Sequence, residues 1–287
     1  MPVCILTDSI SDLPPRIVQE LGITVVPLRI SFGAESYRDG VDLTADEFYE
    51  KLQKSPHFPT TSAPAPVDFA KAYDELAEQA GEVLAITLSA KLSGTYEAAR
   101  QGRELVKKKL RVEVLDSQTA AMAEGLVVLK AAQAAREGAS QEDLADIVQR
   151  TSKRVELLAT FDTLEYLRRG GRIGAAKVFL GSLLKIHPLI TVQDGLVKPA
   201  GRTRSRSKAV ELLYEFAAGY SKIEELGVEY TVCAGEAEGL IDRLSALFPR
   251  PNIFRSQMTP VIGAHTGPGL LVVIALGDKK TQIQIRD

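Results

Sequence analysis

Hydroxyl side chains gather in the stretch ITLSAKLSGTYE, residues 86–97, where an apolar segment ends and a helical pattern begins. Ser89, Ser93 and Thr95 fall within seven positions, and Gly94 stands between the last two. Hydroxyls, a glycine and the free N–H groups of a first helical turn are the usual components of an anion site. We therefore predict that an anion binds here, although Ser93 is equally typical of a residue that only caps the helix.

Two further polar segments strengthen this prediction. Thr60, Thr61 and Ser62 lie between prolines in PTTSAP, and His265 lies in IGAHTGPGLL, residues 262–271, at an expected strand end in the second half of the chain. Taken singly, the first is an ordinary rigid loop and His265 is an ordinary surface residue. Glycines on both sides of His265 let a ligand or a backbone segment approach closely. We expect this histidine to be neutral or to hydrogen-bond, and not to act as a catalytic base.

Ser93, Asp8 and His265 also provide the residue types of a serine-hydrolase triad. The nucleophile of many such enzymes lies in G-x-S-x-G, a strained turn between a strand and a helix. Here the corresponding residues read Lys-Leu-Ser-Gly-Thr, so the first glycine is missing. The sequence therefore favours binding and predicts no catalytic residue. An acyl-ester hydrolase or transferase that uses Ser93 is the alternative.

The sequence lacks the common cofactor motifs. No G-x-G-x-x-G follows the first expected strand and no G-x-x-x-x-G-K-[ST] occurs, which excludes nucleotide sites of these two kinds. His57 and His187 adjoin prolines, without cysteine or acidic residues at metal-ligand spacing. Cys4 and Cys233 lie in apolar runs, which is typical of buried thiols. We predict neither a cofactor nor a metal.

Two basic clusters lie in the second half of the chain. They are LRRGGRI, residues 167–173, and GRTRSRSK, residues 201–208. Each is either a solvated surface or a contact for phosphates or for an acidic protein partner. The chain has 35 basic and 37 acidic residues, and the clusters lack interleaved aromatic side chains, so nucleic acid is not a predicted partner.

Strands and helices alternate in the first half, which is typical of a parallel sheet with helices on both faces. The expected strands are 3–7, 23–32, 82–89 and 111–117, and the expected helices are 14–22, 43–55, 67–80, 94–108, 121–138 and 140–154. Polar stretches follow three of these strands, at 7–12, 88–95 and 115–120. Ligands of parallel sheets bind at this carboxyl edge.

The second half has a different pattern. A strand is expected at 155–162, two helical segments at 164–186, broken by Gly170 and Gly171, and a hairpin at 189–201. Asp194-Gly195 between branched residues is a strong type I′ turn signal. Helices at 207–220 and 238–247 and strands at 227–235 and near 270–276 follow. A hairpin together with helices favours an α+β domain with a mixed or antiparallel sheet.

Length and composition fit this organisation. The 287 residues favour two domains, which we place at residues 1–160 and 161–287. The sequence begins without a basic segment followed by a long apolar one, and no apolar stretch approaches the roughly 20 residues of a membrane span. We expect a cytoplasmic protein of the α/β class.

Five motifs together resemble the DegV family of bacteria, in the order and with the separations of that family. They are TDSISDLP, PTTSAP, LSAKLSGTYEAA, LRRGGRI and HTGPG, and they cover nearly the whole chain. The resemblance implies two α/β domains with a long-chain fatty acid such as palmitate or oleate between them. It also implies the fatty-acid-binding subunit of a fatty acid kinase, which presents the carboxylate to a separate kinase subunit. The product would be an acyl phosphate for phospholipid synthesis.

The resemblance also implies roles for individual residues. The carboxylate contacts would fall on Thr61 and Ser93, with His265 nearby and Ser62 and Gly94 alongside as backbone or hydroxyl donors. The residues that bind the kinase would be in the basic clusters, at Arg169, Arg172 and Arg202. A subunit of this kind has no nucleotide site and is not an enzyme by itself. Transient membrane contact would allow lipid exchange.

The fatty-acid tail needs an apolar tunnel. The expected lining comes from the apolar faces of 121–135 and 173–190, for example Phe179, Leu180, Leu183 and Leu184, although each of these is also typical of an ordinary core residue. Besides the hydrolase, a lipid carrier or sensor without a kinase partner remains an alternative function.

Overall fold

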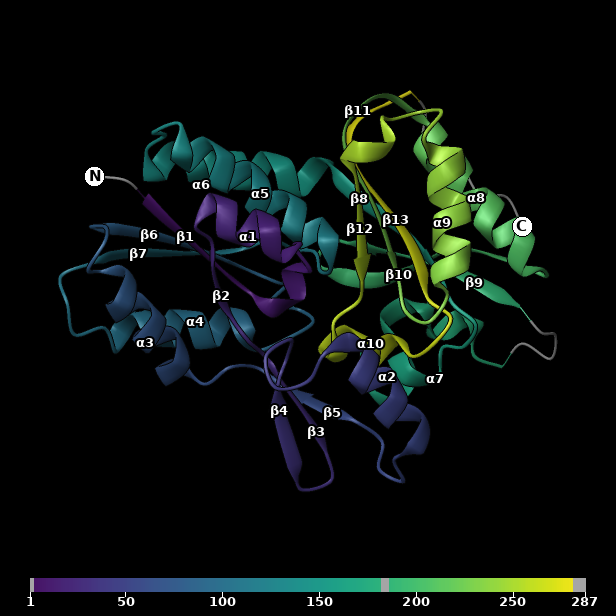
Figure 1. Ribbon diagram of the computed structural model, residues 1–287, viewed down its shortest axis with the longest axis horizontal. Coiled ribbons are helices and arrows are strands. Elements are labelled where there is room, and N and C mark those ends of the chain that lie inside the picture. Colours follow the sequence, from purple (N-terminus) through teal and green to yellow (C-terminus); the bar gives the residue numbers. More distant parts are fainter. Residues whose placement is uncertain (1–2, 182–185, 281–287) are drawn as a thin grey trace.

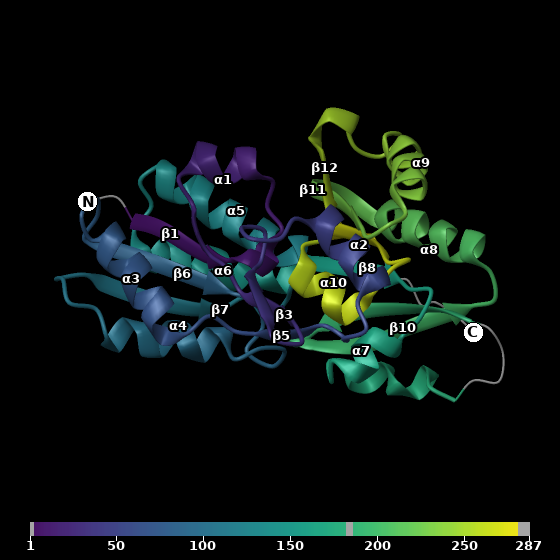
Figure 2. The same ribbon diagram turned by 60° about the horizontal axis from the view of Figure 1, so that its bottom comes forward.

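The first half of the chain forms a four-stranded parallel sheet in the computed structural model, which describes residues 3–181 and 186–280. The strands β1 (Val3–Asp8), β2 (Thr24–Val26), β6 (Glu82–Thr87) and β7 (Arg111–Asp116) are arranged in the order β2-β1-β6-β7. Helices α3 (Pro66–Leu76) and α4 (Thr95–Glu104) cover one face, and α1 (Pro15–Leu21), α5 (Met122–Arg136) and α6 (Gln141–Arg154) cover the other (Figures 1 and 2). This arrangement confirms the expected parallel sheet.

The second half forms a six-stranded mixed sheet, as expected. Its order is β10-β9-β8-β13-β11-β12, and only the pair β11–β12 is parallel. The strands are β8 (Val155–Thr160), β9 (His187–Gln193), β10 (Leu196–Thr203), β11 (Tyr220–Tyr230), β12 (Ile253–Gln257) and β13 (Leu271–Lys279). Helices α8 (Arg206–Ala218) and α9 (Ala234–Leu244) pack on one face. Because β8 pairs within this sheet, we propose a domain division just before Val155.

A third, small sheet corrects one expectation. The predicted single strand 23–32 is divided at Pro27, which has no N–H group for a sheet ladder. Residues before Pro27 form β2, whereas β3 (Arg29–Phe32) pairs with β4 (Glu35–Arg38) and β5 (Thr60–Ser62) in antiparallel fashion. Helix α2 (Ala45–Lys54) packs beside this sheet and begins with a capping box of Thr44 and Glu47.

The segment between β8 and β9 is less helical than its pattern predicts. Helix α7 (Glu165–Arg169) ends at Gly170, and residues 174–179 form a 3₁₀ helix. The hairpin of β9 and β10 turns at Asp194 and Gly195, whose φ angles of 52° and 75° fit the predicted type I′ turn.

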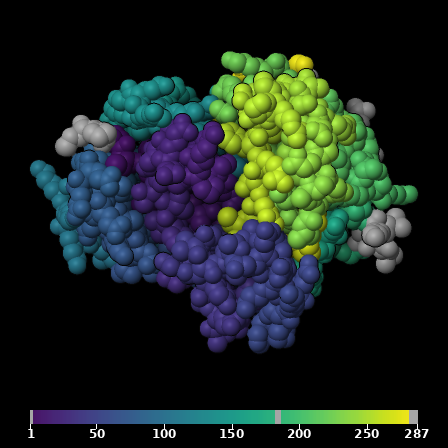
Figure 3. Space-filling model, in the orientation of Figure 1, coloured from purple at the N-terminus to yellow at the C-terminus, as the bar shows by residue number. Residues whose placement is uncertain are grey.

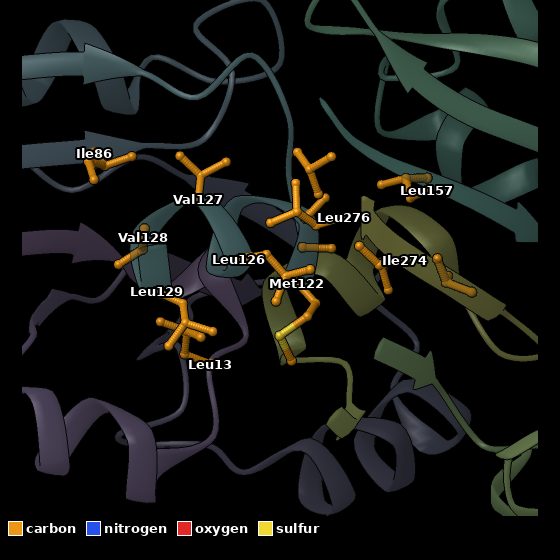
Figure 4. Packing of buried hydrophobic residues seen from close by; sticks show 14 of the residues in the cluster. Leu13, Ile86, Met122, Leu126, Val127, Val128, Leu129, Leu157, Ile274 and Leu276 are labelled. Carbon is orange, nitrogen blue, oxygen red and sulfur yellow. The ribbon is translucent and has the colours of Figure 1, made fainter. Parts of the chain in front are cut away.

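Helix α5 lies between the two large sheets, and most of its residues from Met122 to Ala132 are buried. Its residues belong to the same buried cluster as side chains of both sheets. Figure 4 shows Met122 and Leu126 of α5 beside Ile274 and Leu276 of β13, whereas Leu129 lies beside Leu13. The two halves therefore share one hydrophobic core. Figure 3 shows N-terminal residues in purple packed against C-terminal residues in yellow on the molecular surface.

Candidate functional site

An apolar pocket lies where the two large sheets and the small sheet meet. It holds about 870 Å³ of space between protein atoms, including the part open to solvent. Side chains of β8, β9 and β13 form much of its wall, among them Leu157, Ala159, Ile190, Val192 and Val272, and Phe161 directly after β8 also lines it. Alternate residues of β8 point the same way, so Leu157 and Ala159 make an apolar stripe that Phe161 continues. Such a pocket suits a long hydrocarbon chain.

Polar side chains from four separate elements enter the lining of this pocket. Thr61 comes from β5, Ser93 from the turn before α4, Arg172 from the segment after α7, and His265 from helix α10 (Pro260–Thr266). The Oγ1 atom of Thr61 lies 2.8 Å from Nε2 of His265. The structure thus brings Thr61, Ser93 and His265 to one pocket, and their role in binding a ligand stays a prediction.

His265 was expected at a strand end, and that expectation is wrong. It lies in the last turn of α10, which Pro260 begins and Gly267 ends with a φ of 70°. Burial, with a smaller effect of the Arg172 charge, lowers the pKa of His265 to about 4. The imidazole is therefore neutral at physiological pH. Within the described residues, its Nδ1 atom has no hydrogen-bond partner.

Ser89 and Ser93 have different roles in the loop before α4. The Oγ atom of Ser89 donates to the carbonyl oxygen of Gly195 at 2.8 Å, which ties the loop to the β9–β10 turn. Ser93 lines the pocket and also accepts from the N–H of Thr95 at 3.3 Å, so it is both a lining residue and a local cap. Its hydroxyl lies 2.9 Å from the hydroxyl of Thr95.

Ser62 and Gly94 lie beside the pocket lining and not in it. Along β5 the side chains alternate, so half-buried Thr61 faces the pocket whereas Ser62 is exposed. Gly94 is exposed at the start of α4, with nothing within 4 Å of the position that a side chain would occupy. Their contribution to ligand binding stays a prediction.

The basic clusters do not form a uniform exposed strip. Arg169 is exposed, and its guanidinium stacks on the Phe58 ring at 3.7 Å. Arg172 lines the pocket, where its Nε donates to the carbonyl oxygen of Leu92 at 3.0 Å. Arg206 is turned inward and pairs with Glu236 at 2.7 Å. Among the arginines of the second cluster, Arg202 and Arg204 are the exposed ones.

Within the described residues, the expected tunnel lining is confirmed at only two positions. Segment 121–135 contributes Ala121 and segment 173–190 contributes Ile190, whereas most of α5 packs in the core between the sheets. Phe179 packs against that core, and Leu180 is 41% exposed. Leu183 and Leu184 lie outside the described residues. The pocket wall comes instead from strands whose side chains alternate between two buried faces, so sequence patterning did not separate pocket from core.

Five buried carboxyl groups lie at the junction of the two halves, and sequence reasoning did not predict that they cluster. They are Asp8, Asp12, Asp39, Glu124 and Glu229. Burial raises the pKa of Asp8 and of Glu229 to about 7 and that of Asp39 to about 6. Burial also raises the pKa of Asp12 and of Glu124 well above the usual range. The only early signal was the polar stretch TDSISD after the first strand.

These carboxyls tie pocket-forming segments together. Asp39 accepts from the Ser9 hydroxyl at 2.7 Å and from the N–H of Val261 at 3.1 Å. Glu229 of β11 accepts from the N–H of Met122 at 3.1 Å, and its charge contributes, after burial, to the raised pKa of Asp12. Val261 lines the pocket, as do the neighbours of Ser9 and Met122 in the sequence. The buried carboxyl groups therefore hold residues of the pocket wall in place.

The structure does not assemble the triad that the alternative function needs. Asp8 accepts from the backbone N–H groups of Ile10 and Leu88, both at 2.9 Å. Nε2 of His265 is paired with Thr61, and the hydroxyl of Ser93 is paired with Thr95. A nucleophilic serine needs a base within hydrogen-bond reach. The geometry therefore favours binding by Ser93 over catalysis.

The described residues, 3–181 and 186–280, contain neither a metal-ligand cluster nor a membrane-spanning helix. In this part of the chain no group of three or more histidine, cysteine or acidic residues is arranged to hold a metal ion. The same residues include no helix with both the length and the apolar character needed to cross a bilayer.

Known proteins resemble this chain over nearly its whole length. A family model described as "Uncharacterised protein, DegV family" matches residues 2–278. A fatty-acid-binding DegV family protein from Thermus thermophilus is 36% identical, with a TM-score of 0.89 over 96% of this chain and 100% of that chain. DegV from Bacillus subtilis, described as a fatty acid binding protein, is 32% identical, with a TM-score of 0.87 over 96% of this chain and 99% of its own.

A third similar protein is described by the fatty acid that it binds. A stearic-acid-binding protein from Eubacterium ventriosum is 25% identical, with a TM-score of 0.84 over 96% of this chain and 98% of that chain.

Proposed function

The chain belongs to the DegV family, and on this premise we propose that it binds a long-chain fatty acid in the pocket between its two sheets. The observation that carries the proposal is the composition of the pocket. Its wall is apolar almost throughout, and its few polar side chains are hydroxyls, one arginine and one neutral histidine. Burial of a sixteen-carbon tail would contribute roughly 10 kcal/mol at about 0.8 kcal/mol per CH₂ group.

The polar side chains suit a carboxylate. The hydroxyls of Thr61 and Ser93 can each donate one hydrogen bond, and Arg172 adds a positive charge at the same pocket. A single carboxylate needs only two to four donors, so this set is sufficient. In this proposal the tail supplies affinity and the polar residues fix the orientation of the ligand.

The direct test is native mass spectrometry of the protein as purified, followed by denaturation and lipid extraction. We expect one fatty acid per chain, or uptake of one palmitate or oleate by the apo protein. A mass that stays apo after incubation with both acids would contradict the proposal. The Ser93 hydrolase would then be tested by a burst of product from an activated acyl ester, with Ser93→Ala as the control.

We further propose that the protein presents the bound carboxylate to a separate kinase subunit. The sequence has neither of the two nucleotide-binding motifs sought, so ATP would be bound by the partner. A carboxylate oxygen would attack the γ-phosphorus of ATP, which forms an acyl phosphate and releases ADP. The exposed arginines Arg169 and Arg202 support docking of such a partner. A carrier or sensor function without a kinase is the alternative.

Charge reversal at Arg202 and Arg204 tests this docking proposal. We expect the double variant with glutamate at both positions to retain bound fatty acid and to lose acyl phosphate formation with the kinase subunit. Lys222→Glu and Lys280→Glu reverse exposed charges elsewhere and serve as controls. Unchanged turnover in the double variant would show that both arginines belong to an ordinary solvated surface and do not bind the kinase.

A further inference from the structure

His265 packs directly against the backbone of Gly170. A Cβ atom added to Gly170 would overlap Nδ1 of the imidazole and lie 3.0 Å from its Cε1 atom. The backbone there has φ −75° and ψ −6°, a right-handed conformation that any L-residue adopts. Glycine is therefore required at this position for space and not for backbone conformation. The two nearest atoms belong to His265, and the carbonyl oxygen of Tyr166 follows at 3.1 Å.

Helices α7 and α10 approach each other closely at a second point. A Cβ atom on Gly267, which follows α10, would overlap the ring of Tyr166 in α7. Gly170 also accepts a hydrogen bond through its carbonyl oxygen from Nη1 of Arg172 at 2.7 Å. The short segment 166–172 thus contacts both His265 and Arg172 in the pocket. The backbone of Gly170 packs against the imidazole of His265, and the carbonyl oxygen of Gly170 accepts from Arg172.

The two ring nitrogens of His265 have different environments. Nε2 lies 2.8 Å from the Thr61 hydroxyl, whereas buried Nδ1 faces Gly170 without a hydrogen-bond partner in the described part of the chain. A neutral imidazole carries one proton, on one of these nitrogens. A proton on Nδ1 would be a buried, unsatisfied donor pointing at a Cα atom, which is costly. A proton on Nε2 instead makes a hydrogen bond to Thr61.

We propose that Gly170 is a positioning residue for His265. Its lack of a side chain lets the imidazole pack against the backbone, and this seat favours the Nε2–H tautomer. The Thr61 hydroxyl then donates its own proton to the ligand carboxylate. The hydroxyl has one proton, and once Thr61 accepts from His265 that proton is free for the ligand. His265 then acts through Thr61 and need not touch the carboxylate. The ligand part of this inference rests on the proposed fatty-acid binding, whereas the seat and the tautomer are properties of the protein alone.

Gly170→Ala tests the seat, with Gly239→Ala as the matched control, because Gly239 lies in α9 with open space around it. The chain has three histidines, so ¹⁵N NMR of the imidazoles is readily assigned with a His265→Gln variant. We expect wild-type His265 to carry its proton on Nε2. In Gly170→Ala the displaced ring becomes solvated, and its pKa should rise from about 4 toward the ordinary 6.5. Gly239→Ala should leave both properties unchanged.

Ligand binding gives the second readout. We expect Gly170→Ala to weaken palmitate binding about tenfold and hexadecanol binding hardly at all, since the alcohol shares the tail and lacks the carboxylate. An unchanged palmitate-to-hexadecanol ratio would overturn the positioning role. A wild-type proton on Nδ1 would overturn the tautomer. If neither lipid binds the wild type, the proposed function fails, and the NMR results still decide whether the seat exists.

A double-variant cycle covers the case in which Gly170→Ala does not fold. Combined with His265→Ala, the added methyl group no longer overlaps the imidazole, and the Tyr166 carbonyl oxygen at 3.1 Å needs only a small shift. The double variant should therefore be about as stable as His265→Ala alone. Persistent unfolding of the double variant would show that Gly170 is required for another reason and would overturn the proposal.

Discussion

Replacing Ala159 by phenylalanine should reduce palmitate affinity by about 100-fold or more while the protein stays folded. Ala159 lies on β8 between Leu157 and Phe161 in the apolar stripe of the pocket wall. A phenyl ring placed there occupies space that the tail would use. Exclusion of four CH₂ groups corresponds to roughly 3 kcal/mol, or about two orders of magnitude in affinity. The ring fills an existing cavity, so little overpacking is expected.

Fluorescence displacement or calorimetry with palmitate measures the affinity, and thermal unfolding of the apo protein checks the fold. Ala246→Phe places the same ring at an exposed position after α9 and should bind palmitate like the wild type. A folded Ala159→Phe protein with unchanged affinity would show that the tail does not lie along β8.

Raising the pH from 7 to 8.5 should lower the free energy of unfolding, opposite to ordinary acid denaturation. The folded protein retains protons on buried carboxyls, whereas the same groups ionise near pH 4 when unfolded. The stability from these groups is complete below about pH 4 and is lost as the pH rises through each folded-state pKa. Each retained proton lowers the free energy of unfolding by about 1.4 kcal/mol per pH unit.

The pH window is chosen to exclude His265. Its pKa of about 4 in the folded protein means that the unfolded state takes up a proton below about pH 6.5, so its contribution rises with pH and is constant above pH 7. Urea unfolding at pH 7, 7.75 and 8.5 gives the slope. Glu124→Gln keeps the hydrogen bond from Thr7 and removes one titrating carboxyl near Asp8, so its slope should be flatter. A wild-type stability that is constant or rises with pH would contradict the prediction.

Local signals predicted most of the fold. The Asp194-Gly195 turn depends only on neighbouring residues, and the structure confirms it. The side-chain caps of helices α2 and α6, at Thr44 and Ser140, are local in the same way. Helix α10 was missed, because a segment with Gly263 and a single turn of apolar residues has little helical signal of its own. Val261 and Ala264 are instead buried in a cluster supplied by β3 and α2 of the first half. Tertiary packing, which no local pattern contains, holds this helix in place.

The candidate site was predictable only in part. Residue types in loops identified Thr61, Ser93 and His265, and they do line one pocket. The electrostatic coupling of Asp12 to Glu229 involves residues more than two hundred positions apart, and no spacing rule predicts it. The role of Gly170 was not predictable either. Its sequence pattern indicated a turn, whereas in the structure the imidazole of His265 packs against it.

The position of β13 in the second sheet determines when the pocket can form during synthesis. This strand follows all the others described, yet it lies between β8 and β11 and pairs with both. On the ribosome, β8 and α5 emerge more than a hundred residues before it, so the side of α5 that packs on β13 has no partner over that interval. The parallel sheet can assemble early, whereas the pocket is completed only when α10 and β13 have left the exit tunnel.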